Sequence, residues 1–187
     1  MAAQTPACLF DTREDQVQEP ISGSECQVVS LDTPLQAFVA MEKSLDDCKQ
    51  DANYERAIST YFVFSPTLTD SLDQNFIGTG VYDNWTKQVE MDVLRLLLSD
   101  AQKLDVSFNP SVLINKNTFV RYRVDYTLDV ILKATPTDTT HYAGVAEFDV
   151  RNEGGNWRVT FWNEVETVAG SSTWGFLKGI LRLRLNP

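Results

Sequence analysis

Histidine and basic side chains are scarce in this sequence, and several classes of site are excluded for that reason. The chain has one histidine, His141, and three cysteines in 187 residues. These are too few for a metal cluster, and His141 has no nucleophile at a readable spacing. Sixteen Lys and Arg residues stand against 26 Asp and Glu residues, which gives a net charge of -10. So acidic a chain repels a phosphate backbone, and we therefore predict no nucleic-acid partner.

Long apolar runs are missing as well. No stretch approaches the roughly 20 apolar residues that span a bilayer, and residues 1–6 lack the hydrophobic region of a signal peptide. Hydrophobic residues nevertheless make up 43% of the chain and aromatic residues 11%, which is enough for a real core. We therefore expect one globular domain with an additional N-terminal tail.

Hydrophobic spacing divides the chain into a tail, a helical half and a strand-rich half. Residues 1–31 show no period and contain several acids, so we predict a flexible acidic tail before a domain over 32–187. Helical spacing predicts helices over 32–48, 51–61, 84–104 and 173–184. Alternation predicts strands over 61–64, 106–114 (bent or bulged at Asn109-Pro110), 120–132, 141–151 and 157–166. Residues 153–156 form a tight hairpin signal between the last two strands.

These elements predict an α+β fold: N-terminal helices packed on a curled antiparallel β-sheet that forms a cone, with a short C-terminal helix. Their order resembles the nuclear transport factor 2-like fold, also called cystatin-like or ketosteroid isomerase-like. Residues 54–66, which end in Phe-Val-Phe-Ser-Pro, and 155–159 followed by Trp162 carry the resemblance. Residues 173–178, followed by Arg182, resemble the C-terminal motif of an uncharacterised bacterial lipoprotein group with this fold.

A second resemblance lies in the tail, at Cys8. Residues 8–14, Cys-Leu-Phe-Asp-Thr-Arg-Glu, and the acidic spacer after them resemble the mature N-terminus of some bacterial lipoproteins. The resemblance implies that Cys8 is acylated, that the spacer is a tether, and that residues 1–6 replace a removed signal peptide. An ordinary thiol is the alternative. In an exported protein we expect a Cys26–Cys48 disulfide worth about 3 kcal/mol; in a cytosolic protein both would be free thiols.

The fold resemblance also implies a cavity between sheet and helices at the open end of the cone. Its candidate lining residues are aromatic, with core packing as the alternative for each: Tyr61, Trp85, Tyr122, Tyr126, Tyr142 and Phe148. Isomerases of this fold use an Asp base in the cavity. The strand carboxyls of this chain alternate onto the outer face, although Asp70 and Asp73 could reach the mouth. We therefore predict no catalytic residue, no metal and no cofactor, with His141 at the surface.

The outer face of the predicted sheet mixes arginines with carboxylates. Alternation along the last strand puts Trp157, Val159, Phe161 and Val165 on the apolar face, which leaves Trp162 on the polar face. We take four residues as interface candidates: Trp162, Arg121, Arg123 and Arg158. Cross-strand ion pairing is the alternative for the arginines. Trp162 would then be covered by the C-terminal helix through Trp174 or Phe176.

Together these observations predict a non-catalytic, exported and lipid-anchored binding or interaction domain of the bacterial cell envelope, which binds a small ligand or an envelope protein. The lipid anchor is its only expected membrane contact, and a homodimer through the sheet face is a further expected association. Two alternatives stay open. One is a small isomerase, dehydratase or cyclase that uses the cavity, and the other is a structural subunit of an envelope or extracellular assembly.

Overall fold

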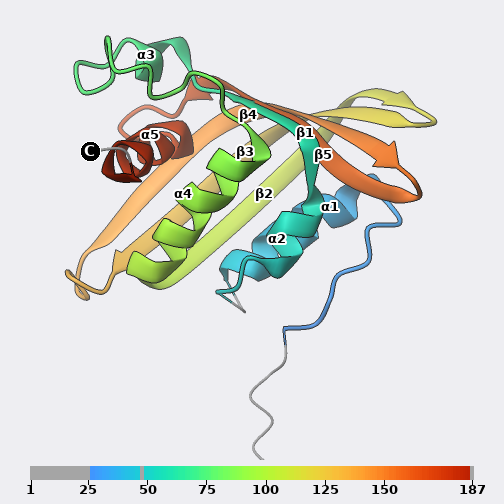
Figure 1. The fold of residues 1–187 in the computed structure, drawn as a ribbon, viewed down its shortest axis with the longest axis horizontal. Helices are drawn as coiled ribbons and strands as arrows, with labels where there is room; N and C mark the ends of the chain where they lie inside the picture. The colour runs from blue at the N-terminus through green and yellow to red at the C-terminus, as the bar shows by residue number, and fades with distance from the viewer. Residues whose placement is uncertain (1–25, 47–48, 186–187) are drawn as a thin grey trace, which may run out of the picture.

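The structure is a computed structural model of the 187-residue chain and describes residues 26–46 and 49–185. Five helices and five strands follow one another within these residues (Figure 1). The helices are α1 (Pro34–Leu45), α2 (Ala52–Ala57), α3 (Leu68–Ser71), α4 (Lys87–Asp100) and α5 (Trp174–Leu185). The strands are β1 (Ile58–Ser65), β2 (Ala101–Lys116), β3 (Phe119–Leu132), β4 (Thr139–Glu153) and β5 (Asn156–Thr167). Within the described part of the chain, no helix is long and apolar enough to cross a membrane.

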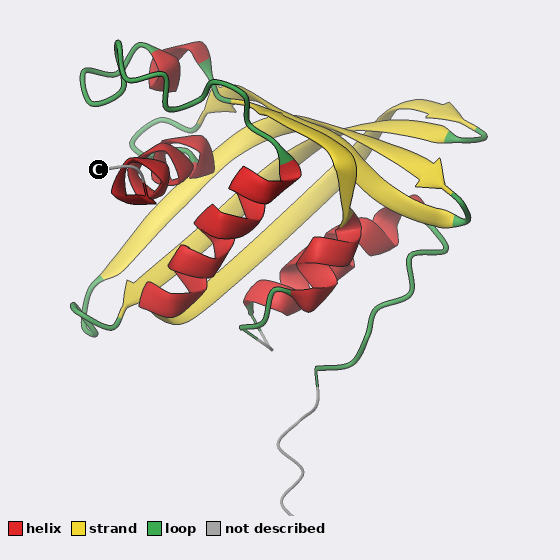
Figure 2. Cartoon of the chain, viewed as in Figure 1, coloured by secondary structure: helices red, strands yellow, loops and turns green. Residues whose placement is uncertain are grey.

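The strands form one curled sheet in the order β1-β5-β4-β3-β2, with the helices on its concave side (Figure 2). The predicted α+β class and the curled sheet are confirmed. One detail of the prediction is wrong, because the sheet is mixed rather than wholly antiparallel. β2 to β5 form the predicted antiparallel meander, whereas β1 enters the sheet from α2 and pairs parallel with β5.

Helix α1 begins where the sequence indicates and also protects an edge of the sheet. Pro34 occupies its first turn, and the Gln36 side chain accepts a hydrogen bond from Thr33 N. At its other end, Glu42 and Asp46 accept hydrogen bonds from the backbone N–H groups of Phe108 and Val106 on β2. The carboxylates of α1 thus satisfy donors that an edge strand would otherwise leave unpaired.

The bend or bulge predicted for β2 at Asn109-Pro110 does not interrupt its pairing there. Pro110 pairs with Val124, and the ladder to β3 continues through it, with irregularities between Ala101 and Lys103 and between Val112 and Ile114. The proline is tolerated because β2 is an edge strand, so its missing N–H removes no bond within the sheet.

A β-bulge in β5 overturns the predicted orientation of its second half. Val159 pairs with Val150 but Phe161 pairs with Asp149, so Thr160 is an extra residue on β5. The bulge reverses the alternation that follows it. Trp162 and Glu164 therefore turn into the core, with exposures of 0% and 3%, and the predicted inward placement of Phe161 and Val165 is wrong.

Residues 26–31 belong with the domain, although the prediction assigned them to the tail. Leu31 O accepts a 2.7 Å hydrogen bond from Trp157 N, and Val29 N donates to Asn53 Oδ1. Both Val29 and Leu31 are buried. Cys8 and Cys48 lie outside the described residues, so acylation of Cys8 and the Cys26–Cys48 disulfide stay predictions.

Candidate functional site

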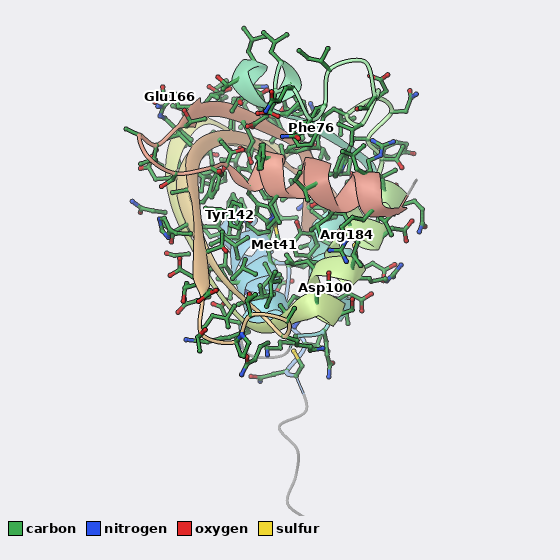
Figure 3. The ribbon with its side chains drawn as sticks, turned by 90° about the vertical axis from the view of Figure 1, so that its left-hand side faces the viewer. Met41, Phe76, Asp100, Tyr142, Glu166 and Arg184 are labelled. Atoms are coloured by element: carbon green, nitrogen blue, oxygen red, sulfur yellow. The ribbon has the colours of Figure 1, made fainter. Side chains whose placement is uncertain are left out.

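The concave side of the sheet is filled by aromatic side chains, some of which come from α5. The Trp174 ring stacks on Phe108 with 5.8 Å between centroids and meets Trp162 edge-to-face at 4.9 Å. Trp162 in turn contacts Phe148 at 4.6 Å. Figure 3 shows α5 crossing the open end of the cone, with Phe76 on one side of the helix and Asp100 on the other. Arg184 of α5 bonds to Asp100 at 2.6 Å. The chain thus closes the cone with its own last helix.

The predicted cavity residues divide between this interior and the outside. Four of them are at most 4% exposed and take part in core packing: Trp85, Tyr122, Tyr126 and Phe148. Tyr142 is half-buried at the rim. Tyr61 is 80% exposed, because β1 turns Phe62 and Phe64 inward and Tyr61 and Val63 outward.

A buried ion pair crosses the interior from α5 to α4. The Lys178 ammonium lies 2.9 Å from Glu90 Oε1, and both side chains are 2% exposed. Tyr54 Oη donates to Glu90 Oε1 at 2.7 Å, and Trp85 Nε1 donates to Glu90 Oε2 at 2.8 Å. Burial lowers the pKa of the Lys178 amine, although the Glu90 charge opposes this shift. Three buried side chains thus contact the Glu90 carboxylate: Tyr54, Trp85 and Lys178.

A second buried carboxyl, Glu164, supports the first turn of α5. Its Oε2 accepts a 2.7 Å hydrogen bond from Tyr126 Oη, and its Oε1 accepts a 3.1 Å bond from Gly175 N. Tyr126 Oη accepts a further bond from Trp174 N. Burial raises the pKa of Glu164 to about 7. The acid and the phenol that could act on a ligand are thus bonded to the backbone of α5.

The two loop acids proposed for the mouth lie together on a shallow pocket. Asp70 is 4% exposed, and its Oδ2 accepts hydrogen bonds from Thr67 Oγ1 at 2.8 Å and Thr173 Oγ1 at 2.6 Å. Thr173 also caps α5, since its Oγ1 accepts from Phe176 N. A pocket of about 380 Å³ is lined by Asp70, Asp73, Thr173 and neighbouring residues of the loop over 167–173.

On the outer face the arginines are engaged in ion pairs. Arg121 binds Asp149 through two hydrogen bonds of 2.6 and 2.9 Å, and Arg123 binds Glu166 at 2.8 Å. Arg158 lies 3.8 Å from Glu153. Trp162 does not lie among them, because the β5 bulge turns it inward against Trp174. The alternative in which Trp162 is exposed on this face is therefore wrong. The C-terminal helix covers Trp162 through Trp174.

The outer face carries a strip of exposed apolar residues that does not include Trp162. Tyr61 and Val63 are 80% and 49% exposed, and with Phe161 they line a pocket of about 500 Å³. Asp149, Arg151 and Glu153 line the same pocket. An exposed aromatic ring bordered by charged groups has the composition of a protein-binding surface.

Comparison with solved structures identifies the architecture. A proposed aromatic ring hydroxylase from Novosphingobium aromaticivorans superposes with a TM-score of 0.60 at 13% identity, over 79% of this chain and 96% of that one. A proposed scytalone dehydratase from the same organism gives 0.56 at 9%, over 74% and 89%. The hexachlorocyclohexane dehydrochlorinase LinA-type3 from Novosphingobium barchaimii gives 0.52 at 11%, over 74% and 90%.

The chain has the nuclear transport factor 2-like fold. At these identities the likeness concerns the fold and not the activity. No protein-family model and no curated protein matches the chain. The solved structures with this fold include a hexachlorocyclohexane dehydrochlorinase and a protein of unknown function from Mycobacterium tuberculosis.

The interior of this nuclear transport factor 2-like domain contains charges that sequence reasoning missed. Glu90 and Lys178 were assigned no role from the sequence, yet both sit on apolar helix faces: Glu90 in register with Leu94 and Leu97, and Lys178 in register with Trp174 and Leu181. That register was a usable signal. The position of Glu164 carried none, because it depends on the bulge.

Metal and histidine chemistry receive no support from the described part of the chain. Residues 26–46 and 49–185 contain no group of three or more His, Cys, Asp or Glu side chains that could hold a metal ion. His141 is about half-exposed at the start of β4, and its Nδ1 lies 2.5 Å from Asp129 Oδ1. His141 forms a cross-strand pair with Asp129 near the β3–β4 turn. It therefore lies at one end of these strands and not among the buried polar groups.

Proposed function

We propose that this chain is a non-catalytic binding or interaction domain, exported and held at the bacterial cell envelope by an acyl chain on Cys8. The filled interior is the observation that carries the proposal. Trp174 packs between Phe108 and Trp162, while Glu164 and Tyr126 are bonded to the backbone of α5. The groups that an enzyme of this fold would turn toward a substrate are turned toward the chain itself.

The outer face of β1 and β5 is the surface that we propose for the partner, which we take to be an envelope protein. Tyr61 and Val63 are the exposed apolar residues at its centre, and Phe161 adjoins them. Aromatic side chains that border charged groups often dominate binding energy. The ion pairs of Arg121 and Arg123 would form the polar rim of such a surface. Because this face carries both signs of charge, a second copy of the chain is also a suitable partner.

The tether rests on the lipoprotein-like residues 8–14 and on the position from which the tail departs. Residues 26–31 run along the domain at the end opposite α3 (Figure 1). An acidic spacer from that end would hold the domain away from the membrane surface and leave the outer face of the sheet accessible. An acylated Cys8 with a charged spacer is a physically consistent anchor, although a single acyl chain binds membranes weakly.

A photo-crosslinking amino acid in place of Tyr61 tests the proposal in the native organism. We expect one discrete adduct with an envelope protein or with a second copy, recovered in the detergent phase and lost from it after Cys8→Ser. The matched control carries the crosslinker in place of Thr137, an exposed residue in the β3–β4 turn. Identical adducts from both positions, or none from Tyr61, would contradict the proposed surface.

A small enzyme is the second candidate, and Glu164 is the observation in its favour. It is a fully buried carboxyl, bonded to Tyr126, with its pKa raised to about 7 by burial. Carboxyls in apolar surroundings serve as acids or bases in such enzymes. Incubating the protein with a metabolite extract tests this candidate by mass spectrometry. Consumption of a metabolite that is lost in Glu164→Gln supports it, and an unchanged extract counts against it.

A further inference from the structure

The ammonium of Lys178 is enclosed by aromatic rings as well as by Glu90. Its Nζ lies 3.4 Å from the Trp162 ring centroid, 4.2 Å from Phe64 and 5.6 Å from Trp174. Glu90 Oε1 lies 2.9 Å from it on the α4 side. Aromatic faces combined with a carboxylate are the arrangement by which proteins recognise organic ammonium ligands. The Nζ is thus held as a bound cation would be.

Stability alone does not account for this arrangement. A buried ion pair seldom contributes more than apolar side chains of the same volume, because both charges must leave water. Glu90 nevertheless receives hydrogen bonds from two further buried residues, Tyr54 and Trp85. Side chains from α2, from α4 and from the loop before α4 therefore converge to orient one carboxylate toward one ammonium. Such convergence of polar groups in an apolar interior is typical of a ligand site.

Helix α5 supplies both the ring and the ammonium that fill this interior. Trp174 and Lys178 are one helical turn apart and lie on the same face of α5. The helix takes no part in the sheet. Local opening of α5 would therefore break no pairing between the strands. Phe64, Phe108 and Trp162 would remain in place on the sheet.

The interior also holds more acids than bases. Glu90, Glu164 and Asp70 are all buried, and Lys178 is the buried amine among them. Asp70 and Glu164 approach each other at the start of α5, where both lie within 3.3 Å of the position that a Cβ on Gly175 would occupy. The Glu90 carboxylate and the aromatic faces beside Lys178 Nζ favour a cation over an anion or a neutral molecule.

We propose that the interior of the cone is a binding site for an aryl-alkyl primary ammonium compound, and that α5 occupies the site as an internal ligand. In the open state the ammonium of the compound takes the place of Lys178 Nζ beside Glu90. Its ring takes the place of the Trp174 indole against Phe108. The proposal is independent of any partner on the outer face, because none of these groups lies there.

The first test vacates the ammonium position in the full chain. The part of the side chain that Lys178→Ala removes corresponds to n-propylammonium. We expect this variant to bind n-propylammonium roughly tenfold or more tightly than n-propanol, measured by calorimetry. Lys178→Met is the matched control, since it fills the same space without a charge and is expected to bind neither. Equal affinity of Lys178→Ala for the amine and the alcohol would overturn the proposal.

The second test uses the unaltered chain and asks whether a ligand competes with α5. Hydrogen exchange over residues 174–185 is measured with millimolar tryptamine and with its neutral analogue, indole-3-ethanol. We expect tryptamine to accelerate this exchange about fivefold or more and indole-3-ethanol to leave it unchanged. Unchanged exchange with tryptamine overturns the proposal. This test is sufficient by itself if Lys178→Ala does not fold.

Discussion

The buried carboxyl of Glu164 makes the stability of this domain depend on pH in a direction that can be calculated. Burial is the main cause that raises its pKa from 4.5 to about 7, and the Asp70 charge adds to it. The Tyr126 bond, the Lys178 charge and the Gly175 N–H oppose the shift. Between about pH 4.5 and pH 7, the folded chain therefore keeps a proton on Glu164 that the unfolded chain releases. This contribution to stability is complete below about pH 4.5 and is lost as the pH rises through about 7.

The magnitude follows from the gap between the two pKa values. That gap corresponds to about 3 kcal/mol of unfolding free energy, most of it lost between about pH 5 and pH 8.5. Glu164→Gln keeps the shape of the side chain but has no proton to release. We therefore expect the unfolding free energy of the natural chain to fall by about 2 to 3 kcal/mol more than that of Glu164→Gln over this pH range.

Urea denaturation at both pH values measures the difference. Ionisable groups that do not interact with Glu164 change equally in the two proteins, so the difference reports on Glu164 and the groups coupled to it. Glu166→Gln is the control, because Glu166 lies on the same strand with its side chain 59% exposed. That variant should follow the natural chain within about 0.5 kcal/mol. If the unfolding free energies of Glu164→Gln and the natural chain changed in parallel with pH, the reasoning would be refuted. Burial would then not raise the pKa of Glu164.

Three further predictions concern packing and the outer face. Trp174→Ala should lower the unfolding free energy by about 3–5 kcal/mol in urea denaturation, because it leaves a cavity at the centre of the aromatic cluster. Gly179→Ala should cost about 1–3 kcal/mol in the same assay, since its Cβ would lie 2.4 Å from Tyr82 Oη and 2.7 Å from Phe76 Cζ; a stable variant would show that α5 packs less closely. Tyr61→Ser should leave stability within about 0.5 kcal/mol while reducing the yield of an adduct formed from a crosslinker at Val63; an undiminished yield would remove Tyr61 from the surface.

The architecture was predictable because its strongest signals are local. Alternation from Val120 to Leu132 defines β3 almost to the residue, and Pro34 marks the start of α1. The hairpin at Gly154-Gly155 joins β4 and β5 as expected, and both glycines have positive φ. Such features need no knowledge of the rest of the chain. The parallel pairing of β1 with β5 was not predictable in this way, because it joins segments about a hundred residues apart.

The polar interior was missed for two different physical reasons. The bulge at Thr160 depends on how β5 pairs with β4, and one inserted residue is enough to exchange the faces of Phe161 and Trp162. Glu90 and Lys178 were instead missed because single charged residues on helices are usually solvated. In the core each charge is balanced by the other, and the two residues come from different helices.

Labelling of the lysine amines under native conditions tests most directly the claim that α5 fills the cone. Lys178 is 2% exposed beside Glu90, whereas Lys103 is 64% exposed. Quantitative reductive methylation followed by peptide mass spectrometry compares the two in one sample. The account predicts that Lys103 is modified while Lys178 is protected until the protein is denatured. Modification of Lys178 at the rate of Lys103 would contradict it, since the ammonium would then lie in solvent and the interior would be open.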